Sequence, residues 1–460
     1  MTLEAIPCIE NTSVDYEGNA SIIFTPVRPS PYTLDSGAIG EEPEIIFQRP
    51  TTGSWNDTAA KPARSQSSSA LTAVSDGVSV SCSECQQGRL VLVDFARALA
   101  IIFMIQGHAL DVLLAPAYRQ GAVFNAWLFL RGLTAPMFFT LSGVSFTVSS
   151  LRRWDSYSRF SPALFRRLGR FAFFILLGYA LHWPAKSFHD FRYMDLAAWQ
   201  GWLQVDVLQC IGLTLILLQI AVLAARTPAR FARVAGAVSA VIVLSTPLIW
   251  AFQGIHRLPL SLASYFDSRT GSLFPLFPWA GYVFFGAAAG YLYIQWHSKV
   301  RPSVFWPMAG GGLILALSGT YFHSMWYKAP LHVYATAEFW RISPNLFLIR
   351  AGCVCGLLAL LAVVIHKIRI PHHATRSFAQ ESLSVYFVHN CCLYGSIWNQ
   401  GLRQRIGASL ALLPTLLWIA GIVASMALLA WTWNWLKRNA PTHSHLFRAA
   451  LFVAVAYSLM

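Results

Sequence analysis

Charged residues are scarce in this sequence. Only 12% of its 460 residues are Asp, Glu, Lys or Arg, whereas 55% are hydrophobic. A soluble domain carries about 25% charged residues. The composition therefore excludes a chain of two or three ordinary soluble domains and predicts one membrane domain with a polar tail.

Acidic residues are rarer still beyond the first 88 residues. Residues 1–88 hold eleven Asp or Glu and four Lys or Arg, whereas the remainder holds nine acidic and thirty basic residues. The basic residues cluster in short loops between apolar runs, which is typical of membrane proteins. The formal net charge of +14 therefore indicates contact with anionic lipid, and we expect no nucleic-acid partner.

The sequence also lacks a second cysteine pair to accompany Cys82 and Cys85, so it predicts no zinc site. Most other cysteines lie in apolar runs, where a free cysteine behaves as a small hydrophobic residue. We expect neither a disulfide framework nor a permanently bound metal or cofactor. The chain starts with no basic segment followed by an apolar one, so we expect no cleavable signal peptide.

Two regions differ sharply in composition. Residues 1–88 are rich in Ser, Thr, Pro and Gly and lack apolar periodicity, which predicts a disordered tail. Residues 89–460 contain repeated apolar runs of the roughly 20 residues that a helix needs to cross a bilayer. They predict an all-α polytopic membrane protein with a bundle of about 10–11 transmembrane helices. The expected helices lie near 90–114, 123–149, 164–183, 203–225, 231–252, 275–296, 304–323, 345–366, 382–398, 408–436 and 446–459.

The Lys and Arg content of the loops predicts the orientation of these helices. One set of alternating loops holds seventeen Lys or Arg, and the other holds nine over longer loops. Because basic loops stay in the cytoplasm, the tail should be cytoplasmic and the first helix should run outward. The outer loops 183–202, 253–274 and 323–344 are rich in aromatic residues, which indicates a membrane-interface belt or, alternatively, a surface for stacking a sugar.

The first expected helix carries a polar stripe. Arg97 and His108 are eleven residues apart, so they share one face and lie roughly 16 Å apart along the axis. Asp94 and Asp111 are displaced from them by about 60°. Ionisable groups within a membrane are costly, so this stripe is a candidate functional site.

The stripe could bind a long donor molecule whose phosphorylated head and reactive end are far apart. A phosphorylated head could sit at Arg97 while the reactive end reaches His108, the natural proton acceptor near neutral pH. Asp111, one turn further on, could orient the imidazole and stabilise its charged form. Two alternatives stay open: His108 could be an ordinary buried histidine, and Arg97 could simply pair with Asp94.

The second and fourth expected helices add candidates. Arg131 enters from the outer side, and Ser142 beside a glycine would let a ligand approach closely, with helix packing as the alternative. Asp206 and Gln209 share a face at a spacing of three residues. They lie at a depth similar to that of His108 and could meet it.

Two later segments complete the set. Trp279 follows two prolines that interrupt the start of a helix, and it should lie at the membrane interface. In the ninth expected helix, one face is formed by Glu381, Ser382, Tyr386 and His389. A short polar helix at membrane depth usually faces a cavity, so this face should line one.

The opening helix resembles that of the membrane-bound acyltransferase superfamily, and the spacing of Arg97 and His108 is similar to that in acyltransferase-3 proteins, which modify surface sugars. Taken in order, the polar segments look more like the heparan-alpha-glucosaminide N-acetyltransferase branch and its bacterial relatives. This resemblance covers most of the membrane domain, from about residue 89 to residue 390. The matching pieces are Asp94-Phe-Ala-Arg97 with Met104 and His108, Ser142-Gly143-Val-Ser, Asp206-Val-Leu-Gln209-Cys-Ile-Gly212, Pro278-Trp279-Ala-Gly and Ser384-Val-Tyr-Phe-Val-His389.

The resemblance implies an acyltransferase of a bacterial inner membrane. Its co-substrate would be an acyl-CoA, usually acetyl-CoA, bound from the cytoplasm, and its acceptor a sugar, amino sugar or glycan on the far side. His108, with Asp111, would be catalytic, either activating the acceptor or carrying the acyl group. The sequence leaves room for a homo-oligomer. The residues expected to bind substrate or acyl-CoA are Asp94, Arg97, Arg131, Ser142, Asp206, Gln209, Trp279 and His389.

Two rival functions fit a basic polytopic bundle with aromatic outer loops. One is a transporter or flippase of a glycan or lipid-linked substrate, without covalent chemistry. Interrupted helices at corresponding positions of two halves, the usual pointer to a transporter, are not visible in the sequence. The other is an inactive partner in polysaccharide assembly, whose histidine stripe merely packs and which binds no CoA.

Overall fold

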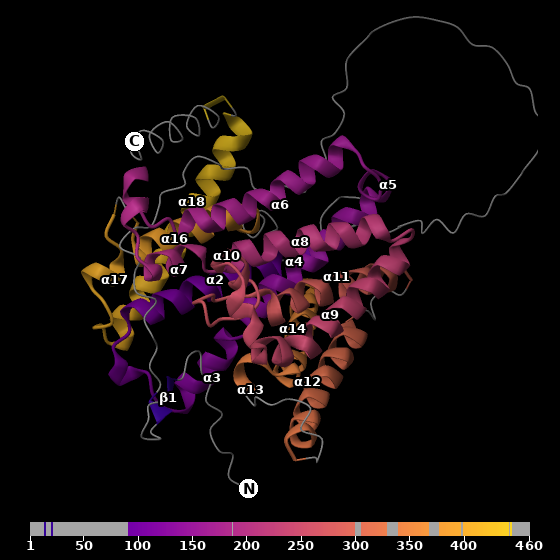
Figure 1. Cartoon of the computed structure of the whole chain (residues 1–460), viewed down its shortest axis with the longest axis horizontal. Helices are drawn as coiled ribbons and strands as arrows, with labels where there is room; N and C mark the ends of the chain where they lie inside the picture. The colour runs from indigo at the N-terminus through magenta and orange to yellow at the C-terminus, as the bar shows by residue number, and fades with distance from the viewer. Residues whose placement is uncertain are drawn as a thin grey trace, which may run out of the picture.

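The structure, a computed structural model, consists of helices packed side by side (Figure 1). It describes residues 13–14, 20–21, 91–185, 187–299, 305–328, 339–367, 377–396, 399–440 and 442–443. The first two pairs form the antiparallel strands β1 (Ser13–Val14) and β2 (Ala20–Ser21). The rest of the disordered tail predicted over residues 1–88 lies outside the described residues.

Six segments of the described chain are long and apolar enough to cross a membrane, as judged by length and composition. They confirm the prediction of an all-α polytopic membrane protein. One segment combines α3 and α4, which were predicted as one helix but are separated by a break at Gly132 and Leu133. The six are α2 (Val91–Leu113), α3 (Ala122–Arg131) with α4 (Thr134–Arg152), α8 (Val207–Ala224), α9 (Pro228–Ala251), α14 (Pro344–Lys367) and α18 (Leu412–Asn439).

Four more of the expected membrane helices are also helical: α6 (Pro162–Leu181), α11 (Leu276–Lys299), α12 (Phe305–Lys328) and α16 (Ser382–Tyr394). With 13 residues, α16 is about 20 Å long, which is too short for a hydrocarbon core of about 30 Å. It stops before residue 398 because the chain turns at Gly395, whose φ of 86° favours glycine. The eleventh helix, expected over 446–459, lies outside the described residues.

Short helical segments form many of the connections between these helices. Some of them lie in the aromatic-rich loops that were predicted between the membrane helices. The segments are η1 (Pro116–Tyr118), α5 (Trp154–Tyr157), η2 (Phe188–Tyr193), α7 (Leu196–Leu203), η3 (Gln253–Arg257), α10 (Leu260–Ala263), α13 (Phe339–Ile342) and α17 (Leu402–Arg405).

The start of α8 shows how the local sequence sets a helix end. The predicted helix begins at residue 203, whereas α8 begins at Val207 because Asp206 caps it. The Asp206 side chain accepts a hydrogen bond from the Val207 N–H at 2.7 Å, and the Asp206 N–H donates to Gln209 Oε1 at 3.2 Å. This reciprocal arrangement is a capping box, which satisfies N–H groups that the helix itself leaves unpaired.

Small residues bring α4 and α11 into close contact. A Cβ atom at Gly143 would overlap the carbonyl oxygen of Val283, and one at Gly286 would overlap the carbonyl oxygen of Thr140. Such close approach of backbones is typical of helix packing in membranes. Gly143, beside Ser142, is therefore part of a close contact between helices, as the helix-packing alternative predicts.

Replacing Gly286 by Val should destabilise the protein, because the added side chain has to push α4 away from α11. Overpacking of this kind typically costs about 1–3 kcal/mol. Gly310→Val in α12 is the matched control, since no heavy atom of the described residues outside its own helix backbone lies within 4 Å of a Cβ built at Gly310. Thermal unfolding of the two variants in the same detergent measures the difference, and equal melting temperatures would contradict the packing described here.

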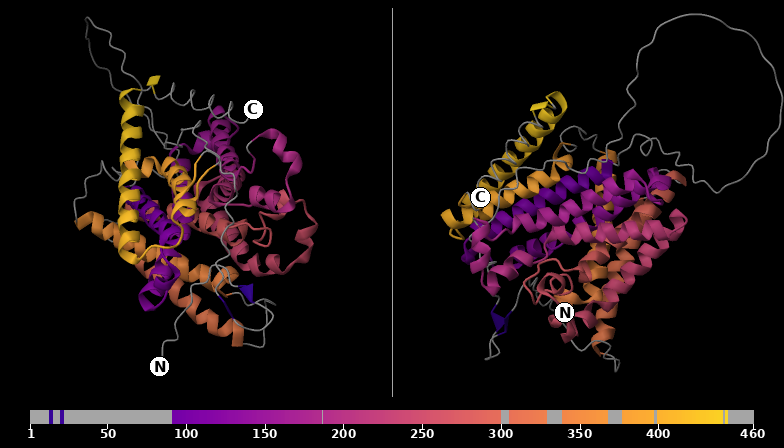
Figure 2. Two further views of the ribbon diagram at one scale, coloured as in Figure 1. Left: turned by 90° about the vertical axis from the view of Figure 1, so that its left-hand side faces the viewer. Right: turned by 45° about the horizontal axis from the view of Figure 1, so that its top comes forward.

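The helix that carries the predicted polar stripe, α2, lies inside the bundle, in contact with α4, α14, α16 and α18. Figure 2 shows α16 and α18 along one edge of the molecule. The end of α2 is tied to the start of α18, since Leu410 donates to Leu113 O at 2.9 Å and accepts from the Ala115 N–H at 2.9 Å. Near the other end of α18, Lys437 lies 2.6 Å from the fully buried carboxylate of Glu381. These contacts hold α16 and α18 against α2.

Candidate active site

Two histidines from distant parts of the chain meet inside the bundle. His108 lies near the end of α2, and His389 lies near the end of α16. Nδ1 of His108 is 3.2 Å from Nε2 of His389, and the rings stack with centroids 5.3 Å apart. His389 is fully buried, whereas His108 is partly exposed. The structure thus brings together two of the residues selected from the sequence.

The hydrogen bonds around His389 determine which nitrogen of each neutral ring carries a proton. Nδ1 of His389 lies 2.7 Å from the carbonyl oxygen of Val385, which can only accept, so this nitrogen must donate. In the neutral ring, Nε2 of His389 is then an acceptor, and Nδ1 of His108 must donate to it. Nε2 of His108 then carries the electron pair of the neutral ring that can accept a proton.

Aromatic and amide side chains surround this pair. The ring of Tyr394 meets His108 edge-on at 5.7 Å, and the ring of Tyr386 meets His389 edge-on at 5.8 Å. Asn390 interacts with the side chain of His108 and donates to the carbonyl oxygen of Tyr386 at 2.7 Å. The histidines therefore sit in a defined environment with little freedom to rotate.

Asp111 makes a two-pronged ion pair with Arg131, one turn beyond His108. Nη1 of Arg131 donates to Oδ1 of Asp111 at 2.9 Å, and Nη2 donates to Oδ2. Arg131 lies across Gly107, where an added Cβ would come within 2.8 Å of its Nε. The sequence-based role of Asp111 was to orient His108; in the structure its carboxylate holds Arg131, and His389 is the hydrogen-bond partner of His108.

A second arginine, Arg119, binds backbone carbonyl groups at the C-terminal end of α2. Arg119 donates to the backbone oxygen of Asp111 at 2.9 Å and to that of Leu114. Burial lowers the pKa of the Arg119 guanidinium from its usual value, while the Asp111 carboxylate acts in the opposite direction. Two positive groups therefore surround Asp111 close to the histidine pair.

Asp206 is connected to the site through Tyr386 of α16. Its Oδ2 accepts a hydrogen bond from the Tyr386 hydroxyl at 3.1 Å and lies 3.8 Å from Nε2 of His182. Tyr386 in turn contacts His389, so Asp206 is linked to the histidine pair by one intervening side chain. Gln209 is fully buried and belongs to the capping box, with its amide donating to Gln204 O at 3.3 Å.

The remaining sequence candidates lie away from these contacts. Arg97 donates to Ser145 Oγ in α4 at 2.8 Å, and Asp94 lies in the first turn of the same helix α2. Ser142 donates to Phe138 O within its own helix at 2.8 Å. Trp279 belongs to an aromatic cluster in which its ring lies 4.7 Å from that of Phe274 and 5.4 Å from that of Phe139.

Three neighbours of the site did not emerge from the sequence: His182, Asn390 and Tyr394. His182 is a single polar residue just past the end of α6, whereas Asn390 and Tyr394 are four residues apart on α16 and so share one of its faces. The adjacent pair of His389 and Asn390 was the available signal, because two polar residues in a row are unusual in a membrane helix. Among the described residues, no group of three or more His, Cys, Asp or Glu is arranged to hold a metal ion.

Comparison with known proteins identifies the family. No match to the chain is found among the curated proteins. The profile of the family described as heparan-alpha-glucosaminide N-acetyltransferase, catalytic, matches residues 89–321, just over half of the chain. The matched region contains His108, Arg131 and Asp206, whereas His389 lies beyond it. The chain therefore belongs to the heparan-alpha-glucosaminide N-acetyltransferase catalytic family.

Proposed function

We propose that this protein is a membrane acetyltransferase that moves an acetyl group from acetyl-CoA in the cytoplasm to a hydroxyl or amino group of a glycan on the opposite side. The family name supports acetyl transfer to a glycan. The observation that carries the proposal is the histidine pair, in which Nε2 of His108 is the nitrogen of the neutral ring that can accept a proton. A proton acceptor inside a membrane domain is what acyl transfer to a hydroxyl or amine requires.

The reaction can be written with His108 as the general base. Nε2 of His108 takes the proton of the acceptor O–H or N–H as that oxygen or nitrogen attacks the thioester carbonyl carbon. The new O–C or N–C bond forms, the C–S bond breaks, and His108 returns the proton to the departing thiolate of CoA. Arg131, close to His108, adds positive charge on the side where the carbonyl oxygen becomes negative.

The length of α2 supports a site in which the donor binds near one end of the helix and reacts near the other. Arg97 lies eleven residues before His108, roughly 16 Å along the helix axis. Loop charges favour a cytoplasmic start of α2, so Arg97 would meet the phosphorylated part of CoA while the thioester reaches His108. Arg97 binds Ser145 here, and a phosphate would compete with that hydroxyl for the guanidinium.

The test is saturable acetyl-CoA binding, together with acceptor-dependent release of CoA, by the purified full chain in detergent. Arg97→Ala should weaken binding about tenfold, since hydrogen bonds to charged groups contribute roughly 1.5–3 kcal/mol. Arg233→Ala, an exposed arginine in α9, is the matched control and should bind normally. A well-folded wild type that binds no acetyl-CoA would contradict the proposal and favour a transporter.

His389 should act by positioning His108 rather than by touching the substrate. His389→Ala removes the acceptor for the Nδ1 proton of His108, so kcat should fall roughly tenfold to hundredfold with little change in the KM for acetyl-CoA. His389→Gln keeps a hydrogen-bond acceptor and should recover most of the activity. ¹⁵N solid-state NMR of histidine-labelled protein should show a shift of the His108 tautomer in the Ala variant; an unchanged tautomer would remove the basis for this role.

A further inference from the structure

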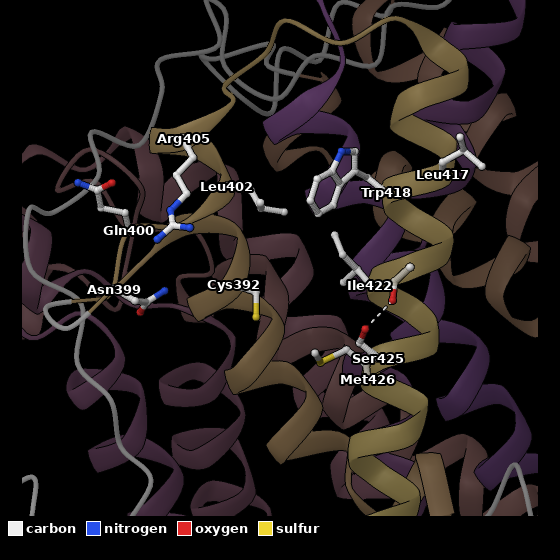
Figure 3. Close-up of a pocket in the computed structure, with 11 residues that line it drawn as sticks. Cys392, Asn399, Gln400, Leu402, Arg405, Leu417, Trp418, Ile422, Ser425 and Met426 are labelled. Atoms are coloured by element: carbon white, nitrogen blue, oxygen red, sulfur yellow. Dashed lines mark hydrogen bonds between the residues drawn. The ribbon is translucent and has the colours of Figure 1, made fainter.

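A pocket of about 660 Å³ opens between α16, α17 and α18 (Figure 3). Its volume lies within the range of about 300–1,000 Å³ that is usual for ligand sites. None of the described residues that line it is acidic. They are Cys392, Asn399, Gln400, Leu402, Arg405, Leu417, Trp418, Gly421, Ile422, Ser425 and Met426.

The two walls of this pocket differ in character. Figure 3 shows Asn399, Gln400 and Arg405 on one side, where they supply two amides and a guanidinium. The facing wall is one side of α18, where Trp418 and Ile422 present apolar surface. A pocket with one cationic, amide-bearing wall and one apolar wall matches an amphiphile with an anionic head and a long apolar chain.

Gly421 lines the pocket on α18, and its lack of a side chain leaves space there. Among the described residues, no heavy atom outside the backbone of its own helix lies within 4 Å of a Cβ built at Gly421, in contrast to the crowded glycines between α4 and α11. The Ser425 hydroxyl donates to Gly421 O at 2.7 Å, so it is bound to its own helix rather than to a neighbour. The described residues therefore leave the space above Gly421 unpacked.

The pocket shares helix α16 with the histidine site. Cys392, which lines it, follows His389 by three residues on α16, less than one helical turn. Gln404, next to Arg405, donates to the carbonyl oxygen of Tyr394 at 2.7 Å, and the ring of Tyr394 contacts His108. The short helix that carries Arg405 is thus linked to the proposed base through Gln404 and Tyr394.

We propose that this pocket binds the lipid part of the acceptor, a sugar joined through a phosphate to a long apolar chain. The phosphate would bind Arg405 with the amide of Gln400, since the Asn399 amide already donates to Cys391 O and accepts from Ser396. The chain would lie along Gly421 and Trp418. This proposal rests on the acetyltransferase function, because it assigns the acceptor of that reaction. The exposed apolar wall formed by Leu417 and Trp418 suits an apolar chain better than a free, water-soluble sugar.

The first experiment measures binding without any acyl donor. A long-chain alkyl phosphate with a photoreactive diazirine in its chain is added to the full-length protein in detergent, and the labelled residues are mapped by mass spectrometry. Labelling should centre on residues 417–426. It should fall at least fivefold in Arg405→Gln and be lost in Gly421→Leu, which fills the space above Gly421, but persist in the matched controls Arg257→Gln and Gly310→Leu.

The second experiment compares acceptors. Arg405→Gln should raise the KM for a lipid-linked sugar phosphate about tenfold and leave that for the same sugar without lipid unchanged. Labelling that ignores Gly421→Leu, competition by an ordinary anionic phospholipid as strong as that by the lipid-linked sugar, or cross-linking of Gly421 positions between two copies would each overturn the proposal. Labelling at 417–426 with no acetyl transfer to any acceptor would leave the amphiphile site standing and refute the acetyltransferase function instead.

Discussion

His108→Ala should lower kcat for acetyl transfer by about 10²–10⁴-fold, the usual contribution of a general base. The reason is that the hydrogen-bond chain through His389 to Val385 O makes Nε2 of His108 the nitrogen of the neutral ring that can accept a proton. Acetyl-CoA binding should persist, because the proposed phosphate contact at Arg97 is far along α2. Single-turnover release of CoA, measured beside donor binding, separates the two effects.

The control for this variant is His366→Ala, which changes an exposed histidine at the end of α14. It should behave as the wild type in both assays. Full transfer activity in a correctly folded His108→Ala protein would rule out the role of His108 as base. Accumulation of an acetylated His108 in the wild type would instead assign it as the acetyl carrier, since direct transfer leaves the imidazole unmodified.

The ion pair between Asp111 and Arg131 should account for the second large effect, and here the effect is on stability as well as activity. Breaking a fully buried pair costs about 3–5 kcal/mol. Because these side chains keep 30% and 17% of their surface exposed, we expect a smaller loss, roughly 2 kcal/mol, for Asp111→Asn or Arg131→Met alone. Each variant should also lose activity, since Arg131 packs across Gly107, the neighbour of His108.

A double-mutant cycle isolates the pairing from other consequences of each substitution. Asp111→Asn with Arg131→Met leaves no uncompensated charge, so the double variant should be more stable than the sum of the single losses predicts. Its activity should stay low, because the positive charge near His108 is still missing. Additive losses of melting temperature across the cycle would show that the two side chains are not energetically coupled.

Much of the fold was predictable because the apolar runs are long. The helices α9, α11 and α14 lie within a few residues of their predicted ranges, since a membrane helix is marked by about 20 apolar residues. The start of α8 was missed by four residues, although Asp206 and Gln209 have the spacing of a capping box. That spacing had been interpreted as a binding face, because both interpretations place the two side chains on the same side of the helix.

The candidate site was predictable only in part, for a reason rooted in helix geometry. Periodicity shows which residues of one helix share a face, so His108 and His389 were both selected. It does not show which helix lies opposite that face. The partners of His108 and Asp111 are therefore features that only the folded chain supplies.

The histidine pair also sets when activity can first appear during synthesis. His389 leaves the ribosome 281 residues after His108, a delay of roughly 15–55 s at usual elongation rates of 5–20 residues per second. Until then, the helices of the matched region lack the partner that orients the base. Under the proposed function, a nascent chain already inserted in the bilayer therefore has low activity until its last helices are made.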